Sequence, residues 1–159
     1  MTKNKKKDAE PESKTVAQNR KARFDYFIED TMEAGIVLTG TEVKSLRAGG
    51  TSINESHASV KGSEIFLLNA HIPEYKQAHG KLQHEVRRPR KLLLHKNQIS
   101  KLIGAIQRKG TTIVPLAVFF NKRGIAKVLL GIAAGKKQHD KRNFEKKRHP
   151  GRVKSWIMR

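Results

Sequence analysis

A glycine-containing segment followed by lysines, Gly131-Ile-Ala-Ala-Gly135-Lys136-Lys137, is the part of the sequence that most suggests phosphate chemistry. The phosphate-binding loop of nucleotide hydrolases has four residues between its glycines, and a Ser or Thr after its lysine reaches magnesium. This segment has three residues between its glycines and a second lysine after the first. Nucleotide hydrolysis is therefore not expected, and the segment is interpreted as chain that leaves a last strand.

The histidines offer the other candidates for chemistry. Neighbours His139 and Asp140 pair a candidate base with an acid, but adjacent residues rarely reach the required geometry, and no Ser, Cys or metal-ligand set accompanies them. We interpret them as part of a cationic tail in which the imidazole stacks on an RNA base. His71, His79 and His84 lack the spacing and the acidic or thiol companions of a metal site and are expected to be exposed. The sequence predicts no catalytic residue, metal or cofactor.

The net charge of +20 is concentrated at the two ends of the 159-residue chain. Residues 1–23 carry +5, residues 135–159 carry +8, and the longer stretch between them carries +7. Such a field attracts polyanions. A membrane is not expected as the partner, because the chain shows no amphipathic anchor or signal sequence and its longest apolar run, residues 113–120, is too short to span a bilayer. A nucleic acid is therefore predicted. The lack of cysteine excludes disulfides and thiol catalysis and fits a reducing compartment.

The length fits one domain with basic extensions. Residues 1–18 have too few apolar groups to offset the entropy of ordering, so they are predicted to be a disordered basic arm. Residues 19–134 are expected to form the RNA-binding core. Residues 135–159 are expected to be a basic tail that is disordered until it binds, and Pro150-Gly151 opposes one continuous helix through it.

The elements expected within the core are mainly short strands. Strands are predicted at 26–28 and 35–38 around an acidic bend at 29–34, at 57–60 and 64–68, and at 112–120 and 125–132 around a hairpin turn. One helix is expected between an N-cap at Thr41 and a stop at Gly49-Gly50, and another has the apolar face Ile99, Leu102, Ile103 and Ile106. Residues 76–91 are interpreted as a basic excursion. The pattern predicts a mainly β fold with added helices, an antiparallel barrel like the oligonucleotide-binding (OB) fold.

Five segments in order resemble one family. They are Asn19-Arg-Lys-Ala-Arg-Phe-Asp-Tyr26, Glu33-Ala-Gly-Ile-Val-Leu38, Gly40-Thr-Glu-Val-Lys-Ser-Leu-Arg47, Arg90-Lys-Leu-Leu-Leu94 and Gly135-Lys-Lys-Gln-His-Asp-Lys-Arg142. Together they are similar to the small protein B (SmpB) family, which binds transfer-messenger RNA (tmRNA, or SsrA RNA) in bacterial trans-translation. The resemblance covers about residues 19–142, and it implies the same OB-fold barrel.

The resemblance implies a non-enzymatic adaptor for ribosome rescue in the bacterial cytoplasm. Such an adaptor binds the tRNA-like end of tmRNA as a monomer and delivers it to stalled 70S ribosomes. Elongation factor Tu and alanyl-tRNA synthetase act on the tmRNA itself, so they are indirect partners.

The resemblance also assigns residues. Those expected to bind tmRNA are Asn19, Arg20, Lys21, Arg23, Glu33, Leu93 and Lys127. Lys127 suits a phosphate contact. Glu33 suits either hydrogen bonds from base amino groups or 2′-hydroxyls or the positioning of a neighbouring Lys, and Leu93 fits either RNA packing or the core. The tail residues expected in the decoding centre, against 16S ribosomal RNA, and in the messenger channel are Gly135, Lys136, Lys137, His139, Asp140, Lys141, Arg142, Ile157 and Met158.

Two alternatives remain open from the sequence. A ribosomal or ribosome-assembly protein would share the charge, the tails and the barrel. An RNA-modifying or RNA-cleaving enzyme would need an active site for which the sequence offers no residues.

Overall fold

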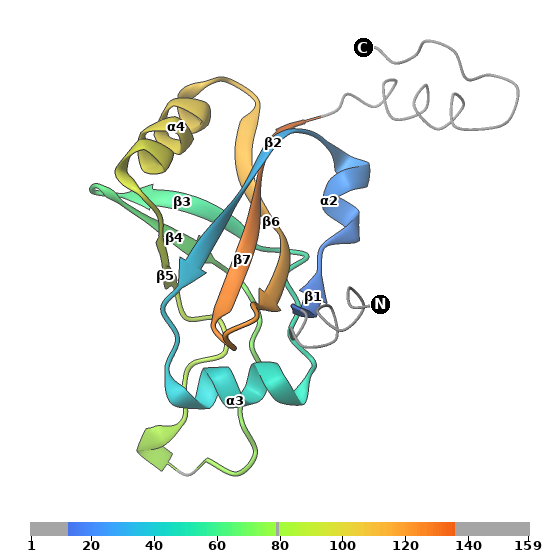
Figure 1. The fold of residues 1–159 in the computed structure, drawn as a ribbon, viewed down its shortest axis with the longest axis vertical. Helices are drawn as coiled ribbons and strands as arrows, with labels where there is room; N and C mark the ends of the chain where they lie inside the picture. Colours follow the sequence, from blue (N-terminus) through green and yellow to red (C-terminus); the bar gives the residue numbers. More distant parts are fainter. Residues whose placement is uncertain (1–12, 79, 136–159) are drawn as a thin grey trace, which may run out of the picture.

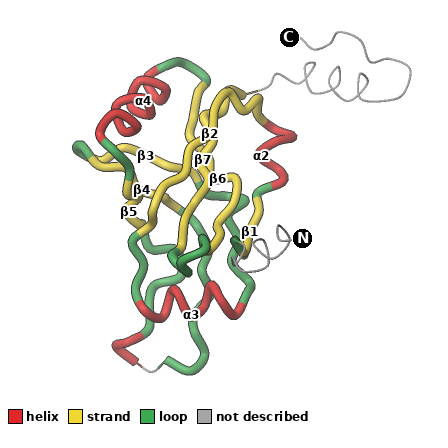
Figure 2. Tube along the Cα trace, viewed as in Figure 1, coloured by secondary structure: helices red, strands yellow, loops and turns green. Residues whose placement is uncertain are grey.

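The computed structural model of the chain describes residues 13–78 and 80–135. Within them, the secondary structure is mainly short strands (Figures 1 and 2). The strands are β1 (Lys14–Gln18), β2 (Tyr26–Ile36), β3 (His57–Lys61), β4 (Glu64–Leu68), β5 (Arg90–Leu93), β6 (Thr111–Phe120) and β7 (Ala126–Gly135). The helices are α2 (Arg20–Asp25), α3 (Gly40–Ala48), α4 (Lys96–Gln107) and a short 3-10 turn, η1 (Gly80–Leu82).

Six of the strands close into a barrel. The order β6-β3-β4-β5-β2-β7 returns to its start because β7 also pairs with β6, and every pairing is antiparallel. Closure removes free sheet edges, which is the usual solution for short antiparallel strands. The predicted OB-like antiparallel barrel with added helices is confirmed.

Alternating residues of the strands fill the barrel interior with aliphatic side chains. Ile65, Leu92, Val128 and Leu130 are at most 2 % exposed. α3 crosses one end of the barrel and α4 lies at the other (Figure 1). Each helix contributes to this core, through Leu46 of α3 and Leu102 of α4. The apolar face predicted from residues 99–106 is confirmed, since its other members pack against the same core.

A second, smaller core lies outside the barrel wall, beneath α2. Val114, Leu116 and Ala133 are buried there against Ala22 of the helix. Side chains alternate across a strand, so β6 supplies residues to both cores. The apolar outer face of β6 and β7 therefore explains why α2 packs at this position.

The N-terminal boundary differs from the prediction. Residues 14–18, which were expected to be part of a disordered arm, form β1 and pair antiparallel with the last residues of β6. β1 pairs with the part of β6 that β3 does not cover, since β3 meets β6 only at Ile113, and Val16 and Ala17 pack on the core. This order comes from the partner strand, which composition alone does not reveal. Residues 1–12 lie outside the described residues.

The predicted acidic bend is also wrong. Residues 26–36 form one strand, with a bulge between Ile28 and Asp30. Glu29 and Asp30 remain compatible with a strand because they pair at the surface with Arg108, the C-cap of α4, and with Lys101 of α4. Their charges are thus neutralised by a helix that is far away in the sequence.

The helix α3 begins two residues earlier than predicted. Its N-cap is Thr39, and Glu42 completes a capping box: the Thr39 hydroxyl accepts from the Glu42 N–H, and the Glu42 carboxylate accepts from the Thr39 N–H. The helix ends as predicted, because Gly49 adopts a φ of 103° that other residues disfavour.

The two hairpins are confirmed, with small changes at their ends. β3 and β4 are joined by a turn around Gly62, and β6 and β7 by residues 121–125. β7 extends to Gly135, so the segment that resembled a phosphate-binding loop begins as strand. A Cβ at Gly131 would lie 3.0 Å from Leu116 Cδ1, so a larger residue there would require Leu116 to shift.

In the described part of the chain, no helix has the length and apolar character needed to cross a membrane.

Candidate nucleic-acid interface

Three residues singled out by the sequence resemblance, Glu33, Leu93 and Lys127, line one surface pocket of about 520 Å³. They come from three different strands, β2, β5 and β7. The register brings them together, because Gly35 of β2 lies opposite Leu93 on one side and opposite Lys127 on the other. The pocket therefore combines an acid, an aliphatic side chain and a cation on the outer face of the barrel.

Leu93 is a surface residue, which settles its position between the two alternatives that the sequence left open. Its side chain is 51 % exposed, although the preceding Leu92 is buried in the barrel. The space beside it exists because Gly35 has no side chain: a Cβ there would lie 3.3 Å from the Leu93 Cβ. Leu93 is thus an exposed apolar group on a polar rim, a combination suited to packing on a sugar or base.

Glu33 and Lys127 project from the same face of neighbouring strands. Glu33 lies diagonally across from Lys127, since it precedes Gly35 by two residues. No ion pair joins them in the described structure, whose ion pairs involve other residues. The ammonium group is available to a phosphate and the carboxylate to a hydrogen-bond donor.

The pocket also contains residues that the sequence analysis missed. His95 and Gln98 line it from the N-terminal end of α4, and Ile125 lines it from the turn before β7. The positive end of the helix dipole adds to the attraction for a phosphate group. The spacing of His95 and Gln98 was the available signal, because the Gln98 side chain accepts from the His95 N–H (3.0 Å) as in a capping box.

Substituting Gly35 tests whether Leu93 must occupy its observed position. The Gly35→Ala variant places a methyl group against the Leu93 Cβ, and we expect a tenfold or greater loss of RNA affinity with little change in secondary structure. Gly104→Ala is the matched control, because a Cβ at this helical glycine meets nothing within 4 Å. Filter binding and circular dichroism of both variants provide the measurement. Equal affinities of the two variants would contradict this role of Leu93.

Asn19 lies in a different part of the interface and is 4 % exposed. Its side chain caps α2 by accepting from the Ala22 N–H (3.1 Å) and donates to the carbonyls of Pro115 (2.9 Å) and Ile53 (3.3 Å). All of these partners belong to the protein. The structure therefore gives Asn19 a positioning role, holding α2 against β6.

The cations of α2 point outward from this anchor. Arg20, Lys21 and Arg23 are exposed, and Arg20 donates to the Gln18 side chain (3.3 Å). Lys21 lines a second hollow of about 380 Å³, which it shares with Tyr26 and residues 54–57. No residue lines both this hollow and the pocket at Lys127. The predicted tmRNA-binding residues thus form two groups.

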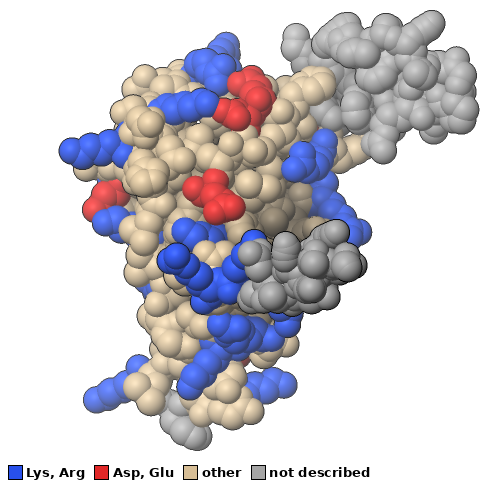
Figure 3. Space-filling view, in the orientation of Figure 1, with Lys and Arg blue, Asp and Glu red and all other residues tan. Residues whose placement is uncertain are grey.

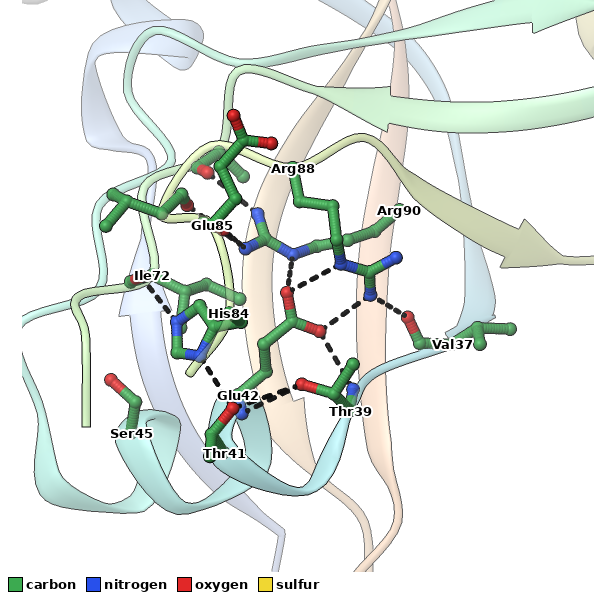
Figure 4. Close-up of polar contacts among 12 residues, drawn as sticks. Val37, Thr39, Thr41, Glu42, Ser45, Ile72, His84, Glu85, Arg88 and Arg90 are labelled. Atoms are coloured by element: carbon green, nitrogen blue, oxygen red, sulfur yellow. Dashed lines mark hydrogen bonds and ion pairs between the residues drawn. The ribbon is translucent and has the colours of Figure 1, made fainter. Parts of the chain in front are cut away.

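A buried polar cluster holds the loop before β5 against α3 (Figure 4). The Glu42 carboxylate, 0 % exposed, accepts from Arg90 Nε (2.7 Å) and from two nitrogens of Arg88 (2.7 and 3.1 Å). Arg90 also donates to the carbonyls of Ala70 and Val86. Because β5 begins at Arg90, this cluster fixes the strand that carries Leu93.

The hydrogen bonds keep Glu42 ionised. Burial alone raises the pKa of its carboxyl group, but the hydrogen bonds from Arg88, the Thr39 N–H and Arg90 outweigh burial and lower the pKa to about 2. The carboxylate is therefore charged at neutral pH, as its two arginine partners require.

Two expectations about the basic excursion at residues 76–91 are wrong. Arg90 is fully buried in the core, and His84 is only 7 % exposed. Both find partners inside the protein: His84 Nε2 lies 3.0 Å from the Ile72 carbonyl, and Nδ1 lies 2.9 Å from the Thr41 hydroxyl. Since a carbonyl only accepts, these bonds assign the proton to Nε2. Composition placed both residues at the surface because basic residues are rarely buried without partners.

The predicted ribosomal tail begins where the described structure ends. Gly135 pairs with Tyr26 at the end of β7, and its N–H donates to the Gly110 carbonyl (3.1 Å). The other predicted tail residues lie outside the described residues: Lys136, Lys137, His139, Asp140, Lys141, Arg142, Ile157 and Met158. Within residues 13–78 and 80–135, no group of three or more His, Asp or Glu side chains is placed to hold a metal ion.

Comparison with known proteins identifies a family. The family model described as SmpB protein matches residues 16–159. A protein of Nitrobacter hamburgensis named SsrA-binding protein is 62 % identical over 146 residues, covering 92 % of each chain. One of Bradyrhizobium sp. (strain BTAi1) with the same name is 59 % identical over 150 residues, covering 94 % of this chain and 95 % of the relative.

A solved structure is similar as well. It is described as "tmRNA-SmpB: a journey to the center of the bacterial ribosome", and its matching chain is 47 % identical with a TM-score of 0.65. The match covers 79 % of this chain and 91 % of that chain.

Proposed function

Because this chain belongs to the SmpB protein family, a family of RNA-binding proteins and not of enzymes, we propose that it is a tmRNA (SsrA)-binding adaptor of trans-translation. It binds the tRNA-like domain of tmRNA and delivers that RNA to stalled ribosomes. The relatives named SsrA-binding protein and the solved tmRNA-SmpB structure support this function.

The main support for the proposal is that the pocket and the start of the C-terminal tail lie at opposite ends of β7. Lys127, in the pocket, is the second residue of β7, and Gly135, where the tail begins, is the last. A strand of this length separates them by roughly 25 Å at about 3.3 Å per residue. The RNA pocket thus lies near one end of β7, and the tail begins at the other end.

At the pocket, each side chain has a distinct part in the proposal. Lys127 contacts a phosphate, Glu33 accepts from a base amino group or a 2′-hydroxyl, and Leu93 packs on a sugar or base. Arg20, Lys21 and Arg23 of α2 add backbone contacts, and Asn19 holds that helix in place.

At the ribosome, the tail carries the function. Lys136, Lys137, Lys141 and Arg142 bind phosphates of 16S ribosomal RNA, and His139 stacks on a base in the empty decoding centre. Ile157 and Met158 lie farther along the messenger channel. The protein acts as a monomer in the bacterial cytoplasm, and elongation factor Tu and alanyl-tRNA synthetase meet it through tmRNA.

Isolation of the RNA that co-purifies from a bacterial lysate tests the proposal. We expect one dominant RNA with a tRNA-like end for the wild-type protein and its loss for Lys127→Ala. Ribosomal RNA alone would instead indicate an assembly protein, and turnover of RNA by the isolated protein would indicate an enzyme.

A further inference from the structure

A strongly cationic surface surrounds α3 and shares only Ile125 with the pocket at Lys127. We define the α3 surface as helix residues 40–48, the adjoining loop 73–83 without residue 79, and the turn 121–125. The Ser45 hydroxyl donates to the Pro73 carbonyl (2.5 Å), which holds the loop against the helix. Six exposed cations lie on this surface with a single exposed acid, Glu74. The cations are Lys44, Arg47, Lys76, Lys81, Lys122 and Arg123.

The exposed acids outside the α3 surface are arranged differently. Glu29, Asp30 and Glu64 pair with Arg108, Lys101 and Lys91. These are the exposed ion pairs of the described structure, and none involves the α3 surface. Figure 3 shows Lys and Arg over the whole of one face, with the acids mostly in its upper half, so its lower half, where α3 lies, is dominated by Lys and Arg.

The α3 surface leaves several cations without an acidic partner. Lys44, Lys76, Lys81 and Arg123 form no ion pair within the described residues. The acid within α3, Glu42, is fully buried and neutralised by Arg88 and Arg90, so it does not offset these charges. An excess of this kind attracts a polyanion and releases the counterions of its phosphates.

The turn on this surface is held in place. The Arg47 guanidinium lies over the Phe120 ring (4.2 Å) and donates to the Gly124 carbonyl (3.4 Å). It therefore fastens the β6–β7 turn to α3. Lys44 lies over the Tyr75 ring (5.8 Å) and links the helix to the loop that carries Lys76. The elements that carry these cations, α3, the loop and the turn, are therefore held together by side-chain contacts.

The α3 surface is continuous with the RNA pocket. Ile125, which ends the turn and is 51 % exposed, also lines the pocket with Lys127. Arg123 therefore precedes the pocket residues by two to four positions along the same turn and strand. Gly135 lies at the other end of β7, so an RNA backbone that fills the pocket reaches the α3 surface before it reaches Gly135.

We propose that the α3 surface binds the phosphodiester backbone of the RNA held in the pocket, extending the tmRNA contact across the β6–β7 turn onto α3. This inference rests on the proposed function and adds Lys44, Lys76 and Arg123 as phosphate-contacting residues. The contact is to backbone and carries no base specificity.

Salt dependence of binding to a transcribed tRNA-like domain of tmRNA tests the inference. The variant Lys44→Gln/Lys76→Gln/Arg123→Gln removes three charges from the α3 surface and leaves Arg47 intact. Three lost phosphate contacts should reduce the log–log salt slope by about 2 to 3, with at least a tenfold loss of affinity at 150 mM salt.

The matched control is Lys61→Gln/Lys101→Gln/Lys109→Gln, which removes the same charge at the end of the barrel where α4 lies. It should keep nearly the wild-type slope. A second variant, Lys44→Arg/Lys76→Arg/Arg123→Lys, retains the charges and should also keep it, and melting curves confirm that all three proteins fold.

Equal slopes for the α3 variant and the control would overturn the inference, since binding would then follow net charge and not position. If the wild-type protein binds and only the α3 result fails, the proposed function stands. If the wild-type protein does not bind this RNA, both fall.

Discussion

Replacing Glu42 with alanine is expected to lower the free energy of unfolding by about 3 to 5 kcal/mol. The substitution leaves Arg90 fully buried with its Nε donor unpaired, and it removes the acceptor of the shortest Arg88 contact. It also removes one half of the α3 capping box. A loss of this size is a large share of the stability of a small domain, so urea unfolding at 25 °C would detect it directly.

Glu64→Ala is the matched control for this experiment. Glu64 also pairs with a cation, Lys91 (2.8 Å), but both side chains are more than 40 % exposed. Water screens an exposed pair, so its removal is expected to cost less than about 1 kcal/mol. If both variants unfold at the same urea concentration, the burial of the Glu42 ion pair does not increase its contribution to the free energy of unfolding, and the prediction is wrong.

The same carboxylate gives a pH dependence with a definite sign. The pKa of Glu42 is about 2 in the folded protein, below the ordinary value of 4.5. The carboxyl group binds its proton more weakly in the folded than in the unfolded protein. Its contribution to the free energy of unfolding is therefore complete above pH 4.5 and is lost as the pH falls toward 2. A difference of this size corresponds to about 3 kcal/mol. Urea unfolding of the wild-type protein at several pH values measures it, and Glu42→Gln should lack most of the decline.

The barrel could be predicted because local patterns and closure agree. The strands at residues 57–68 and 112–132 have turn residues at the right positions, and six short strands have few ways to bury their apolar faces. The secondary-structure predictions failed where a segment is ordered by contacts with residues far away in the sequence. β1 is ordered by β6, and the acids of β2 are neutralised by α4. Neither partner is close in sequence.

Three residues of the pocket were named by resemblance and not by a local pattern. Glu33, Leu93 and Lys127 are separated by up to 94 positions, and only the register of three strands places them together. The functional value of Gly35 depends on the absence of a side chain beside Leu93, which no local pattern indicates. His95 and Gln98, in contrast, carried a helix-start signal that could have been used.

The buried pair of Arg90 and Glu42 shows why composition alone gave the wrong position for part of the basic stretch at residues 76–91. The basic stretch at residues 76–91 contains both a fully buried arginine and exposed lysines, and composition treats them alike. Arg88 and Arg90 are paired with Glu42, whereas Lys44, Lys76, Lys81 and Arg123 beside α3 form no ion pair within the described residues. The positive charge of the core is therefore divided between folding and RNA binding.

Ending the chain after Gly135 is expected to abolish tagging of stalled nascent chains while tmRNA binding stays within about tenfold of the wild type. The physical reason is that the pocket and α2 lie within residues 19–127, and β7 keeps all its pairings up to Gly135. The removed residues carry a net charge of +8, so some non-specific affinity is lost with them. Tagging on truncated messenger RNA in a reconstituted translation system, alongside filter binding, measures both activities.

A scrambled tail separates charge from sequence in this experiment. A chain with residues 136–159 shuffled keeps every Lys and Arg, so it should recover the non-specific part of the RNA affinity without recovering tagging. Restored tagging would mean that the tail acts only as a polycation and that His139, Ile157 and Met158 have no specific part. A loss of tmRNA binding as complete as the loss of tagging would show that the two ends of β7 do not serve separate partners, and the adaptor mechanism would have to be abandoned.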